Sequence, residues 1–353
     1  MHNSIDKSNL RQVILNTPKQ FEEGFKIAKT TKVDGQFYKV VISGMGGSAL
    51  PANLLRTYCN SIQEKHTFGI FVNRFYSLPP EAHSPNTLNL ISSYSGNTEE
   101  TISSLEEAHS SGLKFIGLSS GGKLEELCKK YGASHIKLPY PDPNFQPRMG
   151  TGYFFSTMLQ VLINADLIPD VSSDLVSKAA KLNDVMSQNE EKGRALATKL
   201  VGKTPVIYAS PKYKSVAMIW KIKINENAKT PAFWNFFPEL NHNEMVGFTN
   251  PQGNFLIIML KDQDDDPRNL KRYETTAKLL SEKGIDSEII DMEGSDERSG
   301  GDRLLDKRGT DVFSKMFLSL NLADWTSYYL ALDYKQDPTP VEMVESLKKT
   351  LAS

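Results

Sequence analysis

Two short loops rich in glycine and hydroxyl side chains each lie between an apolar run and an amphipathic stretch. The first is Gly-Met-Gly-Gly-Ser at residues 44–48, where glycines allow the backbone to approach a ligand closely. The second is Ser-Tyr-Ser-Gly-Asn-Thr at residues 93–98. Hydroxyl donors and backbone N–H groups at a helix start, without lysine or arginine, suit a phosphate monoester. The second loop therefore predicts a phosphate site.

A well-capped helix start is the simpler interpretation of the second loop. Asn97 is a natural N-cap, and Glu100 three residues later would complete a capping pattern. A cap, however, needs only one side-chain acceptor, and the hydroxyls of this loop exceed that need. We therefore predict that Asn97 caps the helix, and we favour the phosphate site over a helix start with incidental serines.

The first loop also fits a dinucleotide fingerprint, with Gly44, Gly46 and Ala49 at the required spacing. Such a site calls for an acidic residue near the end of the second strand, and that strand ends in Val-Asn-Arg at residues 72–74. Arg74 could instead suit a 2′-phosphate. A further hypothesis is therefore that this loop binds NADP, in an NADP-dependent oxidoreductase.

The elements that must position these loops alternate between short β-branched runs and amphipathic stretches, which is typical of an α/β fold with parallel sheets. We predict strands at 38–43, 68–72, 88–93, 114–118, 135–138, 206–209, 231–236, 255–260 and 287–291. We predict helices at 98–111, 123–131, 171–199, 215–229, 268–283, 310–333 and 340–351. The domains are expected at 1–170 and 200–353, joined by a helical connector at 171–199.

Length, charge and cysteine content exclude several classes of protein. The 353 residues suffice for about two domains, and 41 Lys+Arg against 42 Asp+Glu argue against a basic nucleic-acid binder. The only cysteines, Cys59 and Cys128, give no disulfide framework, and no apolar run is long enough to span a bilayer. With no signal-peptide pattern at the start, we expect a cytoplasmic protein without a membrane or nucleic-acid partner.

Several motifs together resemble a known family. GMGGSA at 44–49 and SYSGNTEET at 93–101 are similar to the two signature loops of the sugar isomerase (SIS) domain. QPRMGTGY at 146–153, NENAK at 225–229, PELNHNE at 238–244 and DPTPVEMVESLKKTL at 337–351 resemble the bifunctional phosphoglucose/phosphomannose isomerase family. The resemblance implies two SIS-type domains, each a mostly parallel sheet flanked by helices. Ala49, where the family often has glycine, and the charged loop 294–309, which we expect at the surface, depart from it.

The resemblance implies substrate-binding groups at Gly46, Gly47, Ser48, Ser93, Ser95 and Thr98. It also implies catalytic roles for Glu226 as the proton shuttle, Arg148 beside the enediolate, and His242 with a lysine in ring opening. From the residues alone, Glu226 would be an ordinary exposed helix glutamate. His242 would be structural or exposed, and Arg148 a surface residue. The family's histidine is contributed by the partner subunit, which implies a homodimer.

The lysine could be either of two neighbours. On a helix over 340–351, Val341, Met343, Val344, Leu347 and Leu351 share one apolar face. Lys348 lies at the flank of that face, whereas Lys349 points nearly opposite. We therefore prefer Lys348, the residue that aligns with the family's lysine.

We expect no cofactor and no metal, because the six histidines lack ligand spacing and neither cysteine has a CxxC partner. Asp262, Asp264 and Asp266 imitate a calcium loop, but Tyr273 stands where the bidentate glutamate belongs, so we predict a solvated acidic turn.

The principal hypothesis is an aldose–ketose isomerase of glucose 6-phosphate and mannose 6-phosphate, in glycolysis or gluconeogenesis. The alternative is a non-catalytic SIS-type sugar-phosphate-binding regulator.

Overall fold

The computed structural model describes residues 4–63, 67–292, 294 and 306–351. Most of the predicted surface loop at 294–309 therefore lies outside the described residues. The chain divides into two compact units. The sheet A unit comprises Asn16–Asn183 and Asp296–Ser314; the sheet B unit comprises Met1–Leu15, Asp184–Ser295 and Lys315–Ser353. These units are groups of residues in mutual contact, and they do not test where domains begin and end. The domain boundaries 1–170, 171–199 and 200–353 therefore stay a prediction.

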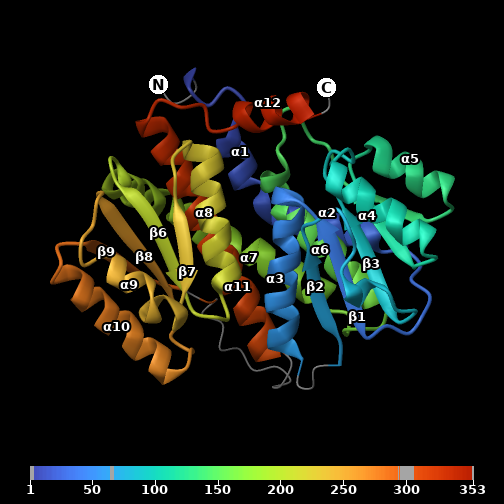
Figure 1. Cartoon of the computed structure of the whole chain (residues 1–353), viewed down its shortest axis with the longest axis horizontal. Coiled ribbons are helices and arrows are strands. Elements are labelled where there is room, and N and C mark those ends of the chain that lie inside the picture. Colours follow the sequence, from blue (N-terminus) through green and yellow to red (C-terminus); the bar gives the residue numbers. More distant parts are fainter. Residues whose placement is uncertain (1–3, 64–66, 293, 295–305, 352–353) are drawn as a thin grey trace. The chain divides into compact units, whose positions relative to one another are not determined.

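The sheet A unit is built on five parallel strands in the order β2-β1-β3-β4-β5. Strands β1, β2 and β3 are labelled in Figure 1. The strands are β1 (Lys39–Gly44), β2 (Gly69–Asn73), β3 (Thr87–Ser92), β4 (Phe115–Ser119) and β5 (Ser134–Lys137). Its helices are α2 (Thr17–Ala28), α3 (Gly46–Ile62), α4 (Glu99–Ser110), α5 (Gly122–Lys130) and α6 (Thr151–Asn164), with short 3-10 helices η2 (Pro80–Ala82) and η3 (Pro147–Gly150). Every residue of β3 is buried, as expected of a central strand covered on both faces.

The sheet B unit has four parallel strands in the order β7-β6-β8-β9. They are β6 (Thr204–Ala209), β7 (Phe233–Phe236), β8 (Phe255–Lys261) and β9 (Asp286–Asp291). Its helices are α1 (Leu10–Leu15), α8 (Lys214–Ala228), η4 (Glu239–His242), α9 (Glu244–Gly247), α10 (Pro267–Ser281) and α12 (Glu342–Leu351). The division between the units falls within α7 (Ser172–Leu200) and α11 (Asp306–Asp333).

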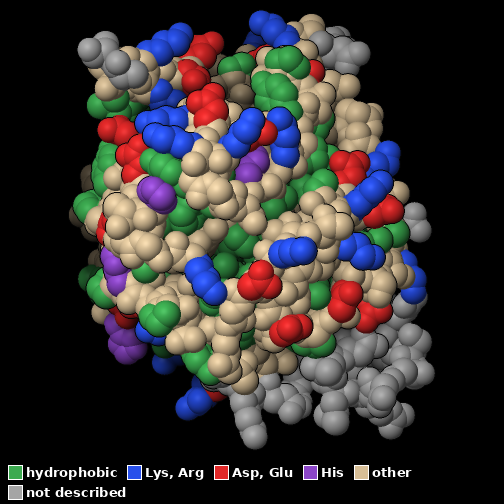
Figure 2. Space-filling model, turned by 90° about the vertical axis from the view of Figure 1, so that its right-hand side faces the viewer, with side chains coloured by type: hydrophobic (Ala, Val, Ile, Leu, Met, Phe, Trp, Pro, Cys, Tyr) green, Lys and Arg blue, Asp and Glu red, His purple; other side chains and the backbone are tan. Residues whose placement is uncertain are grey.

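The α/β class with parallel sheets is therefore confirmed. All nine predicted strands occur, with bounds that differ by about two residues at most. Two strand starts shift by two residues: β6 begins at Thr204 where 206 was predicted, and β7 begins at Phe233 where 231 was predicted. At β7 the reason is Pro231, which lacks the N–H that a ladder needs. Among the described residues, no helix combines the length and apolar character needed to span a membrane. Acidic and basic side chains both occur across the face in Figure 2, in line with the balanced charge.

The packing of α2 on α6 depends on one glycine. A Cβ at Gly24 would lie 2.0 Å from the Ser156 hydroxyl and 2.7 Å from the Tyr153 carbonyl oxygen. Beside this crossing Phe21 packs edge-on against Phe155, with ring centroids 6.4 Å apart. The two helix backbones are thus closer than any side chain at this position would allow.

We predict that Gly24→Val lowers the free energy of unfolding by about 1–3 kcal/mol, since overpacking must push α2 from α6. Urea denaturation followed by circular dichroism measures this. Gly247→Ala is the matched control, because a Cβ there meets nothing within 4 Å, and its effect should be near zero. Equal effects of the two substitutions would contradict the close crossing.

Candidate active site

The carboxyl ends of β1 and β3 meet at the point where the strand order of sheet A reverses. From β1 the chain crosses to β2 on one side, and from β3 to β4 on the other. Parallel α/β sheets bind ligands at such a switch point. The two strand ends are in close contact, because a Cβ at Gly44 would lie 2.7 Å from the Ser92 carbonyl oxygen. Both glycine and hydroxyl loops start at this place.

The first loop is tied to the second through Ser48. The Ser48 hydroxyl accepts a hydrogen bond from the Tyr94 backbone N–H at 2.9 Å, and the Ser92 hydroxyl donates to the Ser48 carbonyl oxygen at 3.0 Å. Because its oxygen is used as an acceptor, the Ser48 hydroxyl hydrogen can be offered to an anion. Gly46, at the start of α3, is exposed and has φ +47°, and a Cβ added there would meet nothing within 4 Å.

The second loop folds against the start of α5. Gly96 has φ +70°, and a Cβ there would lie 1.8 Å from the Gly121 carbonyl oxygen, so only glycine fits. The Ser93 and Thr98 hydroxyls are 2.8 Å apart and hydrogen-bonded. Ser95 is exposed, and its hydroxyl accepts from the Asn97 N–H at 3.3 Å. The hydroxyls thus surround the N-terminus of α4.

The prediction that Asn97 caps α4 is wrong. Thr98 holds the N-cap position of α4 and makes no side-chain cap bond. The Asn97 side chain instead accepts from the Lys123 N–H at 3.0 Å, in the first turn of α5, and donates to the Ser95 carbonyl oxygen at 3.1 Å. The contact of this loop with α5 gives the Asn97 amide a partner that the local sequence does not contain, and Glu100 completes no capping box.

Arg148 lies in η3 and is 3% exposed. Its backbone packs on the first loop, because a Cβ at Gly47 would lie 2.5 Å from the Arg148 nitrogen. Gln20 of α2 secures the next residues: its amide donates to the Met149 carbonyl oxygen at 2.8 Å and accepts from the Gly152 N–H at 3.1 Å. Nothing in the sequence near Gln20 signals this supporting role. The structure thus brings Arg148 together with the phosphate loops, within the sheet A unit.

Glu226 lies in the last turn of α8, in the sheet B unit, and is half-buried. The helix is held along one side by a row of polar bonds to α11. Trp220 donates to the Ser319 hydroxyl at 3.0 Å, Lys223 pairs with Asp324, and the Asn227 amide donates to the Ser327 hydroxyl at 2.9 Å. Within this unit, the helix end that carries Glu226 is therefore firmly placed.

His242 is exposed, while the residues around it are tied down. The Asn241 amide donates to the Thr276 hydroxyl at 3.0 Å. The Glu244 carboxylate accepts from the Tyr208 phenol at 2.6 Å and from the Asn235 amide. Burial and this carboxylate raise the pKa of Tyr208, so the phenol remains a donor. The imidazole is thus presented outward from a fixed loop.

Lys348 is exposed on α12 and donates to Glu345 of the same helix at 2.8 Å. All residues of α12 are exposed, including Met343 (88%), Val344, Leu347 and Leu351 of the predicted apolar face. Val341, which precedes the helix, is half-buried. Glu226, His242 and Lys348 all belong to the sheet B unit, whereas Arg148 and the substrate-binding residues belong to the sheet A unit. Their catalytic and binding roles stay predictions.

Both cysteines are buried free thiols. Burial raises the pKa of Cys128 to about 11, and that of Cys59 higher still. Neither is suited to nucleophilic chemistry, because the thiolate is the reactive form. Among the described residues, no three His, Cys, Asp or Glu side chains are placed to hold a metal ion.

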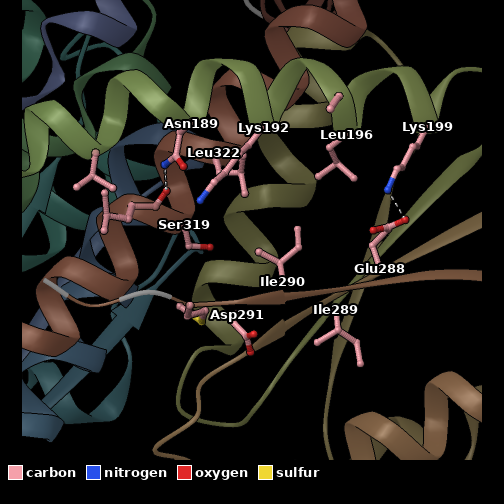
Figure 3. A pocket seen from close by; sticks show the side chains of 14 residues that line it. Asn189, Lys192, Leu196, Lys199, Glu288, Ile289, Ile290, Asp291, Ser319 and Leu322 are labelled. Atoms are coloured by element: carbon pink, nitrogen blue, oxygen red, sulfur yellow. Dashed lines mark hydrogen bonds and ion pairs between the residues drawn. The ribbon is translucent and has the colours of Figure 1, made fainter. Parts of the chain in front are cut away.

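A cavity of about 370 Å³ in the sheet B unit has none of the predicted site residues in its lining (Figure 3). It is bordered by α7, β9 and α11, with apolar walls that include Leu196, Ile290 and Leu322. Two of its polar side chains already have protein partners: Lys199 pairs with Glu288 at 2.7 Å, and Asn189 donates to the Leu318 carbonyl oxygen at 3.1 Å. It is therefore a weaker candidate than the switch point of sheet A.

The predicted solvated acidic turn at Asp262 is only partly right. Asp266 does cap α10, accepting from the Arg268 N–H at 2.8 Å. Asp262 is 0% exposed, and Lys315 of α11 donates to it at 2.7 Å and to Asp264 at 2.6 Å. Burial alone would raise the pKa of Asp262, but the hydrogen bond from Lys315 holds it below the ordinary value. The long-range lysine explains why this carboxylate can be buried.

We predict that Lys315→Met lowers the free energy of unfolding by about 1.5–3 kcal/mol at pH 7. The buried Asp262 then loses its 2.7 Å ion pair and keeps only the longer 3.4 Å pair with Lys212. This contribution is fully present above the pKa of an unfolded aspartate, roughly 4, and is lost as the pH falls through the lower folded pKa of Asp262. The difference between wild type and variant in urea denaturation should therefore shrink at pH 3. Lys123→Met, which removes an exposed 3.7 Å pair with Glu106, is the control. A difference that does not change with pH would refute this account.

The parallel sheets flanked by helices define an α/β fold of the SIS type. Residues 189–351 match the family model for the bacterial phospho-glucose isomerase C-terminal SIS domain. Over 100% of this chain and 95% of the other, the fold resembles a hypothetical protein from Thermus thermophilus, with a TM-score of 0.69 and 14% identity.

Curated relatives identify the family. A bifunctional phosphoglucose/phosphomannose isomerase from Caldicellulosiruptor bescii is 38% identical, over 96% of this chain and 98% of its own. Another from Aquifex aeolicus is 32% identical, over 88% and 90%. The chain belongs to the bifunctional phosphoglucose/phosphomannose isomerase family, and it is an enzyme of the isomerase class.

We predict that Ser48→Ala weakens the binding of inorganic phosphate by about tenfold or more, because a hydrogen bond to a charged group contributes about 1.5–3 kcal/mol. A chemical-shift titration measures the affinity. Ser110→Ala is the matched control, since that hydroxyl donates only within its own turn, to Glu107 at 3.1 Å. Unchanged phosphate affinity in Ser48→Ala would exclude the two loops at residues 44–48 and 93–98 as the anion site.

Proposed function

We propose that the enzyme interconverts glucose 6-phosphate and mannose 6-phosphate with fructose 6-phosphate, through an enediolate and without a metal. The observation that carries the proposal is the pair of hydrogen-bonded loops, residues 44–48 and 93–98, at the carboxyl ends of β1 and β3. We call these two loops the phosphate corner. There the Ser48 hydroxyl binds the Tyr94 N–H, the Ser93 and Thr98 hydroxyls pair, and Gly47 contacts the backbone of Arg148. This arrangement suits a sugar phosphate, and the curated relatives support the same substrates.

The phosphate is bound by Ser48, Ser93, Ser95 and Thr98, together with N–H groups at Gly46 and Gly47. Two partly positive helix ends, those of α3 and α4, point toward this corner, which favours a doubly charged ester. Binding the phosphate in this way fixes the sugar and leaves its first carbons to the catalytic groups.

Glu226 takes the proton from C2 of the open-chain aldose phosphate, and the electron pair forms the enediolate. The same carboxyl then returns the proton to C1, while the hydroxyl proton of O2 passes to O1, which gives the ketose. The buried guanidinium of Arg148 stabilises the charge that develops on the enediolate oxygens. A guanidinium suits this task because it remains charged and carries several donors in one plane.

His242 and Lys348 open the sugar ring by moving protons to and from the ring and hydroxyl oxygens. His242 acts in the site of the partner subunit of a homodimer. Its exposure on a loop that is tied down at Asn241 and Glu244 supports this role. The free buried thiols of Cys59 and Cys128 support a cytoplasmic location.

A non-catalytic sugar-phosphate-binding regulator is the competing function, and Glu226→Gln separates the two. We predict that this variant loses at least about a hundredfold in kcat, as is typical of removing a general base, while binding of glucose 6-phosphate is largely kept. Turnover is followed in a coupled assay with EDTA present, and binding by calorimetry.

Glu282→Gln, at the exposed end of α10, is the matched control and should leave kcat unchanged. A wild-type protein that forms no fructose 6-phosphate from either aldose phosphate would refute the isomerase. Loss of activity with EDTA would refute the metal-free mechanism. The ratio of turnover on glucose and mannose phosphates gives the substrate preference.

A further inference from the structure

The residue that ends α8 has an unusual backbone conformation. Lys229 occupies the C-cap position with φ 56° and ψ 33°, in the left-handed region. Glycine is preferred there, because a Cβ in this conformation costs about 1–2 kcal/mol. A lysine at this position therefore indicates that its side chain contributes something that glycine lacks.

The ammonium group of Lys229 binds three carbonyl oxygens. It donates to Glu226 at 2.5 Å, to Asn227 at 3.4 Å and to Pro338 at 3.2 Å. Glu226 and Asn227 are in the last turn of α8, where the backbone carbonyl groups find no N–H partner within the helix. Pro338 lies in the segment between α11 and α12. One side chain thus joins the end of α8 to the segment that leads to α12.

The same turn of α8 is also held from its other side. The buried Asn227 amide donates to the Ser327 hydroxyl at 2.9 Å, and the Asn225 amide donates to the Thr230 carbonyl oxygen at 2.8 Å. Glu226 lies between these two asparagines. Its backbone is therefore held through Asn227 on the α11 side and through Lys229 on the Pro338 side.

We propose that Lys229 is a positioning residue for the isomerisation. Through the Glu226 carbonyl it sets the backbone from which the catalytic carboxyl projects, and through Pro338 it sets the start of the segment that carries Lys348. The inference rests on the proposed function, since it gives Lys229 a task in the geometry of Glu226. A displacement of about 1 Å in such a group can reduce turnover about a hundredfold.

The test substitutes Lys229→Gly, which relieves the backbone strain while it removes the ammonium. We expect the melting temperature to stay the same or rise, kcat for glucose 6-phosphate to fall about tenfold to a hundredfold, and KM to change little. The phosphate corner, which sets binding, is left untouched. Lys229→Arg, which keeps a cationic donor, should recover part of kcat.

Lys335→Gly is the matched control. Lys335 also has φ 56°, near the end of α11, and its exposed side chain makes no hydrogen bond to any described residue. Its substitution should leave kcat unchanged. An active wild type with an equally active Lys229→Gly variant would overturn the role of Lys229 alone. A wild type without isomerase activity would overturn the proposed function, and this inference with it.

Discussion

The contact between backbones at the carboxyl ends of β1 and β3 is the constraint on which the phosphate corner depends. Gly44 approaches the Ser92 carbonyl oxygen, and Gly47 approaches the Arg148 nitrogen, at distances that admit no side chain. Because the strands are parallel, both following helices start at this edge and direct their N–H groups to it. The hydroxyls of Ser48, Ser93 and Thr98 lie at the same edge, beside these N–H groups.

The groups assigned to proton transfer depend on a different kind of support. Glu226 and His242 project from a helix end and a short loop, and each is flanked by hydrogen-bonded neighbours. Asn227 and Lys229 fix the backbone of Glu226, as Asn241 and Glu244 fix the loop of His242. In both places polar side chains next to Glu226 and His242 make structural contacts that fix the backbone.

Much of the fold was predictable because parallel strands are buried on both faces and therefore appear as continuous apolar runs. Runs such as 88–93 and 255–260 were placed to within about two residues. The close crossing of α2 and α6 was not predicted, since it depends on a pairing of Gly24 with Ser156, which are far apart in the chain. The cap at Asn97 was wrong, and the solvated turn was wrong at Asp262, for the same reason: the partners of these side chains, Lys123 and Lys315, are distant in sequence.

The sequence by itself determined the α/β class, the order of the strands along the chain, and the two loops whose glycines and hydroxyls suit a phosphate. Local pattern suffices there, because burial and turn chemistry are written in neighbouring residues. Only the tertiary structure decided which strand ends meet, which side chain caps which helix, and that Arg148 lies against the first loop. These outcomes depend on contacts between segments far apart in the chain, which no local pattern records.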